Sequence, residues 1–181
     1  MTGPHRFSTH AGTSALLIAT TWIASARAAE RPAAVDSVVF HNHGVTLRGT
    51  LYVPAASGRR PAVVVFHAAG GGTRDFHAYR HLVTTLPAAG FAVLLFDRRG
   101  SGESDGDFPS ATFEDLARDG IAGVSLLRRR LDIDPARVGV WGVSQGGWIA
   151  PLAASLTRDI AFVVAVSAPG VPPRRQMDYA A

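Results

Sequence analysis

Two pentapeptides in this chain have the pattern G-x-S-x-G, in which glycines flank a serine on both sides. They are Gly142-Val143-Ser144-Gln145-Gly146 and Gly102-Glu103-Ser104-Asp105-Gly106. Where such a serine stands on a sharp turn between a strand and a helix, the turn presents its hydroxyl as a nucleophile. The chemistry of that arrangement is acyl transfer, in which the serine attacks a carbonyl carbon and an acyl-enzyme is then hydrolysed.

The neighbouring residues distinguish the two serines. Ser144 follows an apolar run typical of a buried strand and precedes residues 145–156, which are typical of a helix. Ser104 is followed by a polar stretch, and its acidic neighbours would oppose the negative charge of an alkoxide. We therefore predict Ser144 as the catalytic nucleophile and Ser104 as a turn residue.

An attacking serine requires backbone N–H groups that stabilise the oxyanion of the tetrahedral intermediate. One donor is expected to be Gln145, directly after the nucleophile. The second is expected from the loop after the first buried parallel strand, which reads HAAGGGTRD from position 67. Its small residues allow close approach of a substrate. We predict the N–H of Ala69, with Ala68 and Gly70 as alternatives.

A nucleophilic serine needs a histidine and an acid as partners, and every histidine of this chain precedes Ser144. The seven are His5, His10, His41, His43, His67, His77 and His81. We expect His67 to order the loop that it begins. His77 and His81 have i,i+4 spacing without the glutamate of H-E-x-x-H, so we expect a helix surface and no metal. Of the later acids, Asp159 precedes a strand and Asp178 lies near the end. We predict that neither the triad acid nor the triad histidine is among the residues of this chain.

The elements that must position these residues follow from hydrophobic periodicity. Residues 38–53 are typical of an antiparallel hairpin with a turn at 42–44. Apolar runs without alternation then predict strands buried on both faces, as in a parallel sheet; these runs are 62–67, 91–97, 137–142 and 160–170. Helical patterns separate them, at 76–89, from Thr112 to Leu131, and at 148–156. Thr112 and Asp115 have the spacing of a capping box. The final residues show no pattern of helix or strand.

The fold class predicted is therefore α/β, with a mostly parallel sheet covered by helices on both faces and an N-terminal antiparallel hairpin. The 181 residues suit one domain. Residues 1–28 are predicted to be a signal peptide, with an apolar stretch at 15–24 and an A-x-A cleavage signal at 26–28. Residues 29–60 would form the hairpin and 61–181 the partial core. A periplasmic or secreted location is expected, without a stable membrane anchor.

Composition excludes several classes of function. The chain has no cysteine, so disulfides, thiolate metal sites and a cysteine nucleophile are excluded. Its 18 basic residues are all arginine and are dispersed, and without Arg6 and Arg27 of the leader 16 remain against 14 acids. No aromatic-interleaved basic stripe is present, so we expect no nucleic acid partner. No cofactor is indicated, and the composition leaves the oligomeric state open.

Three motifs resemble the α/β-hydrolase superfamily in order and spacing: FHAAGG at the oxyanion loop, FDRRGSGES after the next strand, and GVSQGG at the nucleophile. The chain is similar to bacterial secreted or periplasmic carboxylesterases, with serine aminopeptidases and dienelactone hydrolases as cousins. Ala68 departs from the usual glycine after the histidine. In the DRRG loop the resemblance implies structure more than catalysis, with Asp97, Arg98 and Arg99 in ion pairs that fix the loop.

The resemblance implies a serine hydrolase acting on a small-molecule ester or acyl substrate through Ser144. A serine peptidase or thioesterase of the same fold, and a non-catalytic degraded paralogue, remain alternatives. The family order places the acid and the histidine after later strands than those found here. We therefore expect the sequence to be an incomplete, inactive part of a longer hydrolase, with its sixth strand as an exposed apolar edge.

Overall fold

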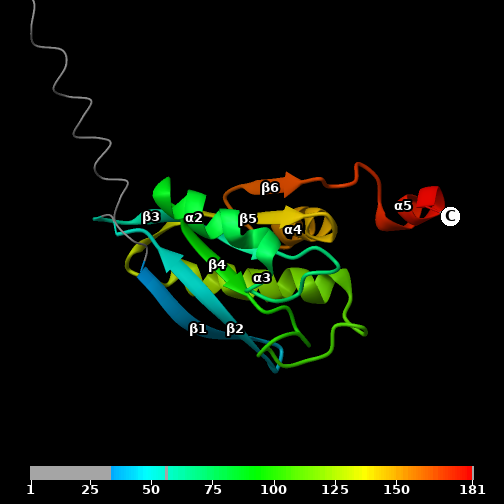
Figure 1. Cartoon of the computed structure of the whole chain (residues 1–181), viewed down its shortest axis with the longest axis horizontal. Helices are drawn as coiled ribbons and strands as arrows, with labels where there is room; N and C mark the ends of the chain where they lie inside the picture. Colours follow the sequence, from blue (N-terminus) through cyan, green and yellow to red (C-terminus); the bar gives the residue numbers. More distant parts are fainter. Residues whose placement is uncertain (1–33, 56, 181) are drawn as a thin grey trace, which may run out of the picture. The chain divides into compact units, whose positions relative to one another are not determined.

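A computed structural model of the chain describes residues 34–55 and 57–180. Six strands form one sheet in the order β1-β2-β4-β3-β5-β6 (Figure 1). The strands are β1 (Ala34–Asn42), β2 (Val45–Val53), β3 (Arg60–Phe66), β4 (Ala92–Phe96), β5 (Ile133–Val143) and β6 (Val163–Val166). The predicted signal peptide lies outside the described residues.

The N-terminal hairpin is confirmed and is longer than predicted. β1 and β2 pair antiparallel from Ala34 opposite Val53 to Asn42 opposite Val45. This register leaves a two-residue turn at His43 and Gly44, whose φ angles are 44° and 84°. Positive φ at both central residues is the geometry that matches the twist of a tight hairpin. β2 then pairs antiparallel with β4 and joins the hairpin to the rest of the sheet.

The other strand pairs are parallel, as the unbroken apolar runs predict. Successive residues of β3 face opposite cores. Val63 and Val65 pack with the helix side chain of Leu82, whereas Val64 packs with Leu127 and other residues of a different helix. Helices thus cover both faces of the sheet, as the fold class requires.

The helical elements are η2 (His77–Tyr79), α2 (Arg80–Ala88), α3 (Phe113–Arg128), α4 (Gln145–Leu156) and α5 (Pro173–Ala180). The predicted capping box is present: the Thr112 hydroxyl accepts from the N–H of Asp115, and the Asp115 carboxylate accepts from the N–H of Thr112. α4 begins at Gln145, earlier than its apolar pattern, and it continues through Pro151.

Two expectations for the end of the chain need correction. Residues 173–180 form α5, although no helix was predicted there. Pro173 is its first residue, and proline is favoured at that position because the N–H it lacks would have no intrahelical partner. β6 is not buried on both faces, since Val163, Val164 and Val166 are 37%, 41% and 37% exposed. The alternative expectation of an exposed apolar edge is confirmed for this strand.

Parallel pairing gathers the loops that carry the motifs. Phe66 at the end of β3 lies opposite Gly142 of β5, and β4 runs parallel to β3 on its other side. The loops after β3, β4 and β5 therefore leave the same edge of the sheet, where ligands bind in open α/β sheets.

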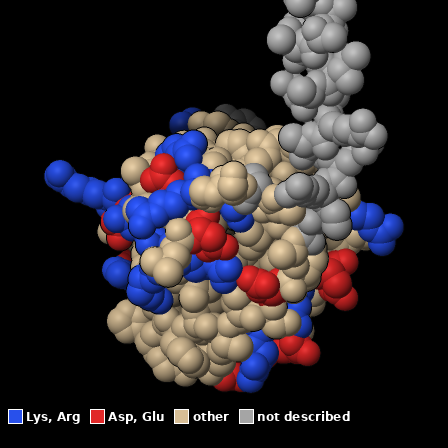
Figure 2. Space-filling view, turned by 90° about the vertical axis from the view of Figure 1, so that its left-hand side faces the viewer, with Lys and Arg blue, Asp and Glu red and all other residues tan. Residues whose placement is uncertain are grey.

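Charged side chains of both signs lie on the surface. Figure 2 shows arginine and acidic side chains intermingled on one face of the molecule. Within the described ranges, every helix is too short or too polar to cross a membrane.

Candidate active site

Ser144 stands at a sharp turn between β5 and α4. Its φ and ψ are 54° and −113°, a conformation that L-residues adopt at a cost of about 1–3 kcal/mol. Its N–H donates to the carbonyl of Val166 on β6 (3.1 Å), and its own carbonyl accepts from the N–H of Gly147 (2.9 Å). The residue is exposed. A strained backbone fixed on both sides thus presents this hydroxyl to solvent.

Close backbone approach explains the two glycines of the motif. A Cβ on Gly142 would lie 2.1 Å from the carbonyl oxygen of Gly146. A Cβ on Gly146 would lie 2.5 Å from the carbonyl oxygen of Phe66 at the end of β3. Since both atoms are backbone, neither contact can relax by moving a side chain. The pattern G-x-S-x-G is therefore required by the geometry of the turn.

The N–H of Gln145 is available for a ligand, because the first residues of a helix have no intrahelical acceptor. The positive end of the α4 macrodipole lies at the same place and favours negative charge. Gln145 follows the exposed hydroxyl directly, as predicted.

The loop after β3 is held by Tyr79, a residue that sequence reasoning missed. Its buried hydroxyl accepts from the N–H of Ala68 (2.9 Å) and donates to the carbonyl of Gly71 (3.2 Å). Burial raises the pKa of this phenol. The N–H of Ala68 is thus already used, which leaves Ala69 and Gly70 of the three candidates. Its hydrogen bonds depend on the position of the loop after β3, which no local pattern in the sequence specifies.

The loop after β4 contains two ion pairs as the resemblance implied. The buried carboxylate of Asp97 accepts from the N–H groups of Arg74 (2.8 Å) and Glu103 (3.0 Å), and the Arg74 guanidinium lies 3.5 Å from it. Arg99 forms a bidentate ion pair with the buried carboxylate of Asp119, with an N···O distance of 2.7 Å to each oxygen. The bond to Asp119 raises the pKa of Arg99.

The expected ion pair of Arg98 is wrong. Among the described residues, no carboxylate lies within ion-pair distance of its guanidinium, which instead contacts backbone carbonyls and an amide side chain. The side chain turns toward the loop after β3 rather than toward Asp97 or Asp119. A charge pattern in the sequence shows that cations and anions are near each other, but only the fold decides which of them meet.

Ser104 is a structural residue, as its context predicted. It is buried; its hydroxyl donates to the carbonyl of Asp97 (2.7 Å) and accepts from the N–H of Arg48 on β2 (3.0 Å). Both hydrogen-bonding functions of the hydroxyl are used to tie the loop to the sheet. A serine engaged in this way has no free proton to give up to a base.

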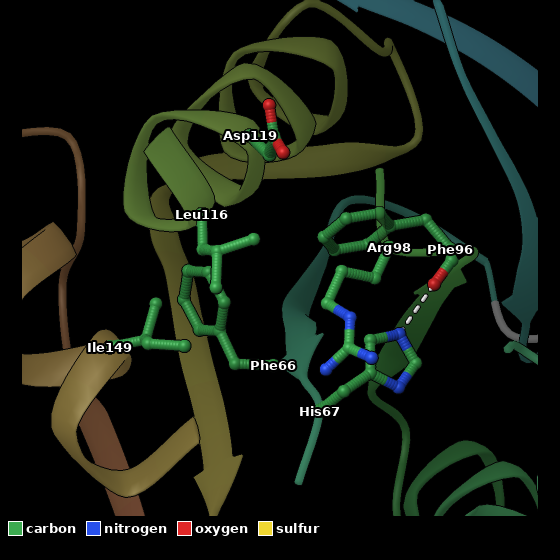
Figure 3. Close-up of a pocket in the computed structure, with 7 residues that line it drawn as sticks. All are labelled: Phe66, His67, Phe96, Arg98, Leu116, Asp119 and Ile149. Carbon is green, nitrogen blue, oxygen red and sulfur yellow. Dashed lines mark hydrogen bonds between the residues drawn. The ribbon is translucent and has the colours of Figure 1, made fainter. Parts of the chain in front are cut away.

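His67 at the end of β3 is buried beside a small pocket that also touches Phe96 and Arg98 (Figure 3). Its Nε2 lies 2.6 Å from the carbonyl oxygen of Phe96. Because a carbonyl only accepts, Nε2 carries the proton, and His67 ties the ends of β3 and β4 together. Burial lowers its pKa to about 4. The imidazole is therefore neutral at pH 7 and is a weak base.

The remaining candidates lie on the surface or away from the serine. His77 and His81 are exposed, and His81 contacts the carbonyl of Ala78. Asp159 follows α4 and pairs with Arg128 (3.1 Å). It precedes the amino end of β6, so it lies at the edge of the sheet opposite Ser144. Asp178 lies in α5. In the described part of the chain, no group of three or more metal-ligating residues is gathered.

A family model described as serine aminopeptidase, S33, matches residues 58–181. The chain belongs to this α/β-hydrolase family. The match includes all three loops of the candidate site.

Two curated proteins illustrate its relatives. A thiohydrolase of Aspergillus aculeatus is 35% identical over 130 residues, which are 68% of this chain and 38% of that protein. An uncharacterized protein of Mycobacterium tuberculosis is 36% identical over 155 residues, which are 80% and 53% of the two chains. The chain thus spans about half the length, or less, of these relatives.

Solved structures show the same fold. The esterase Pf2001 of Pyrococcus furiosus has a TM-score of 0.67 at 28% identity, covering 81% of this chain and 58% of that one. Est1E of Butyrivibrio proteoclasticus, solved with ferulic acid, has a TM-score of 0.68 at 24% identity, covering 78% and 56%. The family match and these structures agree on the α/β-hydrolase fold of the chain.

Proposed function

We propose that this chain supplies the nucleophile and the oxyanion hole of a serine hydrolase that cleaves carboxylic esters. The observation that carries the proposal is the backbone of Ser144, which is strained, exposed and fixed between β5 and α4. Strain of this kind persists only where the surrounding structure imposes it, and it concentrates at active sites. The hydrolase family and its esterase neighbours support the same reaction class.

In the proposed reaction, Oγ of Ser144 attacks the ester carbonyl carbon while its proton passes to a base. The carbonyl π electrons move to oxygen, and the N–H groups of Gln145 and Ala69 donate to the resulting oxyanion. Collapse of the intermediate breaks the bond to the alkoxy group, which leaves as the alcohol. Water then attacks the acyl-enzyme, releases the acid and restores the serine.

The general base is proposed to come from outside these 181 residues. In the printed sequence no histidine follows Ser144, and His67 is neutral, buried and bonded to Phe96. The part that this chain matches is 38% of one relative and 53% of the other. Without a base, the oxyanion hole and binding alone leave only residual catalysis of about 10³–10⁴-fold over water. We expect negligible ester turnover from the chain by itself.

A thioester is the second candidate substrate, because a 35% identical relative is named a thiohydrolase. The attack on the carbonyl is the same, and a thiolate replaces the alkoxide as leaving group. The leaving group distinguishes the two candidate substrates. A longer, active form of the protein would cleave an oxygen ester and a thioester of the same acyl chain at different kcat/KM.

The test of the nucleophile is covalent labelling with a fluorophosphonate at pH 9. Oγ forms a bond to phosphorus, fluoride leaves, and hydroxide takes the serine proton, so no protein base is needed. Intact mass and peptide mapping should show one slow label on Ser144. Ser144→Ala should abolish it, and Ser104→Ala should retain it.

Equal labelling of wild type and Ser144→Ala would refute the nucleophile. Absence of labelling in the folded wild type would favour a non-catalytic paralogue instead. Rapid ester turnover by the 181-residue chain that is lost in His67→Gln or His77→Gln would refute the proposal that the base lies elsewhere.

A further inference from the structure

Arg98, at the start of the loop after β4, lies between the two segments that carry the proposed oxyanion donors. Its Nη1 donates to the carbonyls of Ala68 (3.3 Å) and Ala69 (3.2 Å) in the loop after β3. The same atom lies 3.5 Å from Oε1 of Gln145 at the start of α4. Arg98 is 8% exposed, so these contacts are shielded from water. One guanidinium therefore bridges Ala69 and Gln145.

The contacts to the loop determine how its peptide groups are turned. The peptide bonds of the described residues are trans, so the C=O and N–H of each unit point in opposite directions. The N–H of Ala69 shares its peptide unit with the carbonyl of Ala68. That carbonyl accepts from Arg98 and also from the N–H of Gly71 (3.3 Å), so the N–H of Ala69 is turned away from the guanidinium and remains free to donate. The carbonyl of Ala69 orients the N–H of Gly70 in the same way.

The charge of Arg98 is unusual among the cations of this site. Arg74 and Arg99 each pair with a carboxylate, whereas the polar partners of Arg98 are neutral carbonyl oxygens. Its Cζ lies 3.3 Å from the ring centroid of Phe108, and its buried Nε has no hydrogen-bond partner in the described structure. Burial lowers the pKa of this guanidinium. A desolvated cation without an anion is costly unless a negative charge appears beside it.

We propose that Arg98 is a positioning residue of the oxyanion hole, which orients the peptide of Ala69, fixes Gln145 and leaves its positive charge available to the developing oxyanion. The inference rests on the proposed function of Ser144. Arg98 acts through the backbone amides and does not itself touch the reacting atoms. The sequence shows it only as one of two adjacent arginines, and the other one, Arg99, is neutralised by Asp119.

The loop has other attachments that do not involve the Arg98 side chain. The N–H of Arg98 donates to the carbonyl of Gly72 (2.8 Å), and Tyr79 holds Ala68 and Gly71. Replacing the side chain should therefore keep the loop in place, including the bond from the N–H of Gly71 to the carbonyl of Ala68 (3.3 Å), while removing the guanidinium contacts to the peptides on either side of Ala69. The variant therefore tests the orientation of the amides separately from the folding of the loop.

The experiment is the rate of fluorophosphonate labelling of Ser144 in the 181-residue chain at pH 9, resolved into kinact and KI. We compare wild type with Arg98→Met and Arg98→Lys, and use Arg118→Met as the matched control because Arg118 is an exposed arginine of α3. Removing one oxyanion donor directly lowers rates by about 10²–10³-fold, so a positioning residue should contribute about 10- to 100-fold. We expect that loss in kinact for Arg98→Met, an intermediate loss for Arg98→Lys, and unchanged KI and unfolding midpoints.

A kinact for Arg98→Met within twofold of wild type would overturn the inference about Arg98. Labelling of both proteins would in that case still leave Ser144 as the nucleophile. If Arg98→Met does not fold, Arg98→Lys decides, since a wild-type kinact there would show that the forked contacts to both carbonyls do not matter. A loss confined to KI would assign Arg98 to probe binding and also overturn the inference. Wild-type labelling no faster than Ser144→Ala would refute the proposed function itself.

Discussion

Replacing His67 by glutamine should remove part of the pH dependence of stability. The wild-type imidazole is buried, and burial favours the neutral form, although the hydrogen bond that Nε2 donates to the carbonyl of Phe96 offsets part of this effect. Its pKa falls from 6.5 to about 4 in the folded chain. In the unfolded chain the imidazole regains water and its ordinary pKa, so the unfolded state binds more protons between these two values. Stability from this residue is therefore present above pH 6.5 and is lost as the pH falls towards 4.

The magnitude follows from the two pKa values. One pKa unit corresponds to about 1.4 kcal/mol, so the full shift is worth at most about 3 kcal/mol below both values. Between pH 7 and pH 5, the proton uptake of the unfolded imidazole accounts for a loss of about 2 kcal/mol. Glutamine keeps a side-chain N–H for the Phe96 carbonyl but does not titrate. Its variant should lack this contribution and keep the pH dependence that carboxylates produce.

The assay is urea unfolding followed by circular dichroism at pH 7 and pH 5. The free energy of unfolding of wild type should fall by about 2 kcal/mol more than that of His67→Gln over this interval. His81→Gln is the matched control, because the side chain is exposed, and it should behave as wild type. Equal losses in wild type and His67→Gln would refute the reasoning. If the variant does not fold, an NMR titration of His67 in wild type decides, and a pKa near 6.5 would contradict its burial as a neutral group.

Two further predictions concern the scaffold of the site, and both are checked by chemical denaturation. Thr112→Ala removes the capping oxygen that accepts from Asp115, and should lower the free energy of unfolding by about 1 kcal/mol; Thr112→Ser should restore most of it. Asp119→Ala leaves the Arg99 guanidinium without its buried partner and removes an acceptor of Asn42, and should cost about 3 kcal/mol or more. A loss below 1 kcal/mol for Asp119→Ala would mean that Arg99 finds another anion or water.

The sequence by itself determined the strand and helix pattern, because local periodicity is set by which faces of each element are buried. The hairpin turn at His43-Gly44, the capping box at Thr112 and the turn at Ser144 rest on short-range geometry, so they were predictable. The same reasoning distinguished Ser144 from Ser104 by the helix that follows only the first. It did not predict α5, because no pattern of helix or strand was found in the final residues.

Only the tertiary structure decided how the loops meet. Parallel pairing of β3, β4 and β5 brings residues far apart in the chain to one edge of the sheet, and no local pattern specifies which side chains then touch. The contacts of Tyr79 with Ala68, and of Arg98 with Ala69 and Gln145, are of this kind. The choice between Arg98 and Arg99 for Asp119 depends on the turn of the loop after β4, which the identical residue types could not reveal. The sequence thus located the serine that we propose as nucleophile, and the packing of the loops located the residue that we propose orients its oxyanion hole.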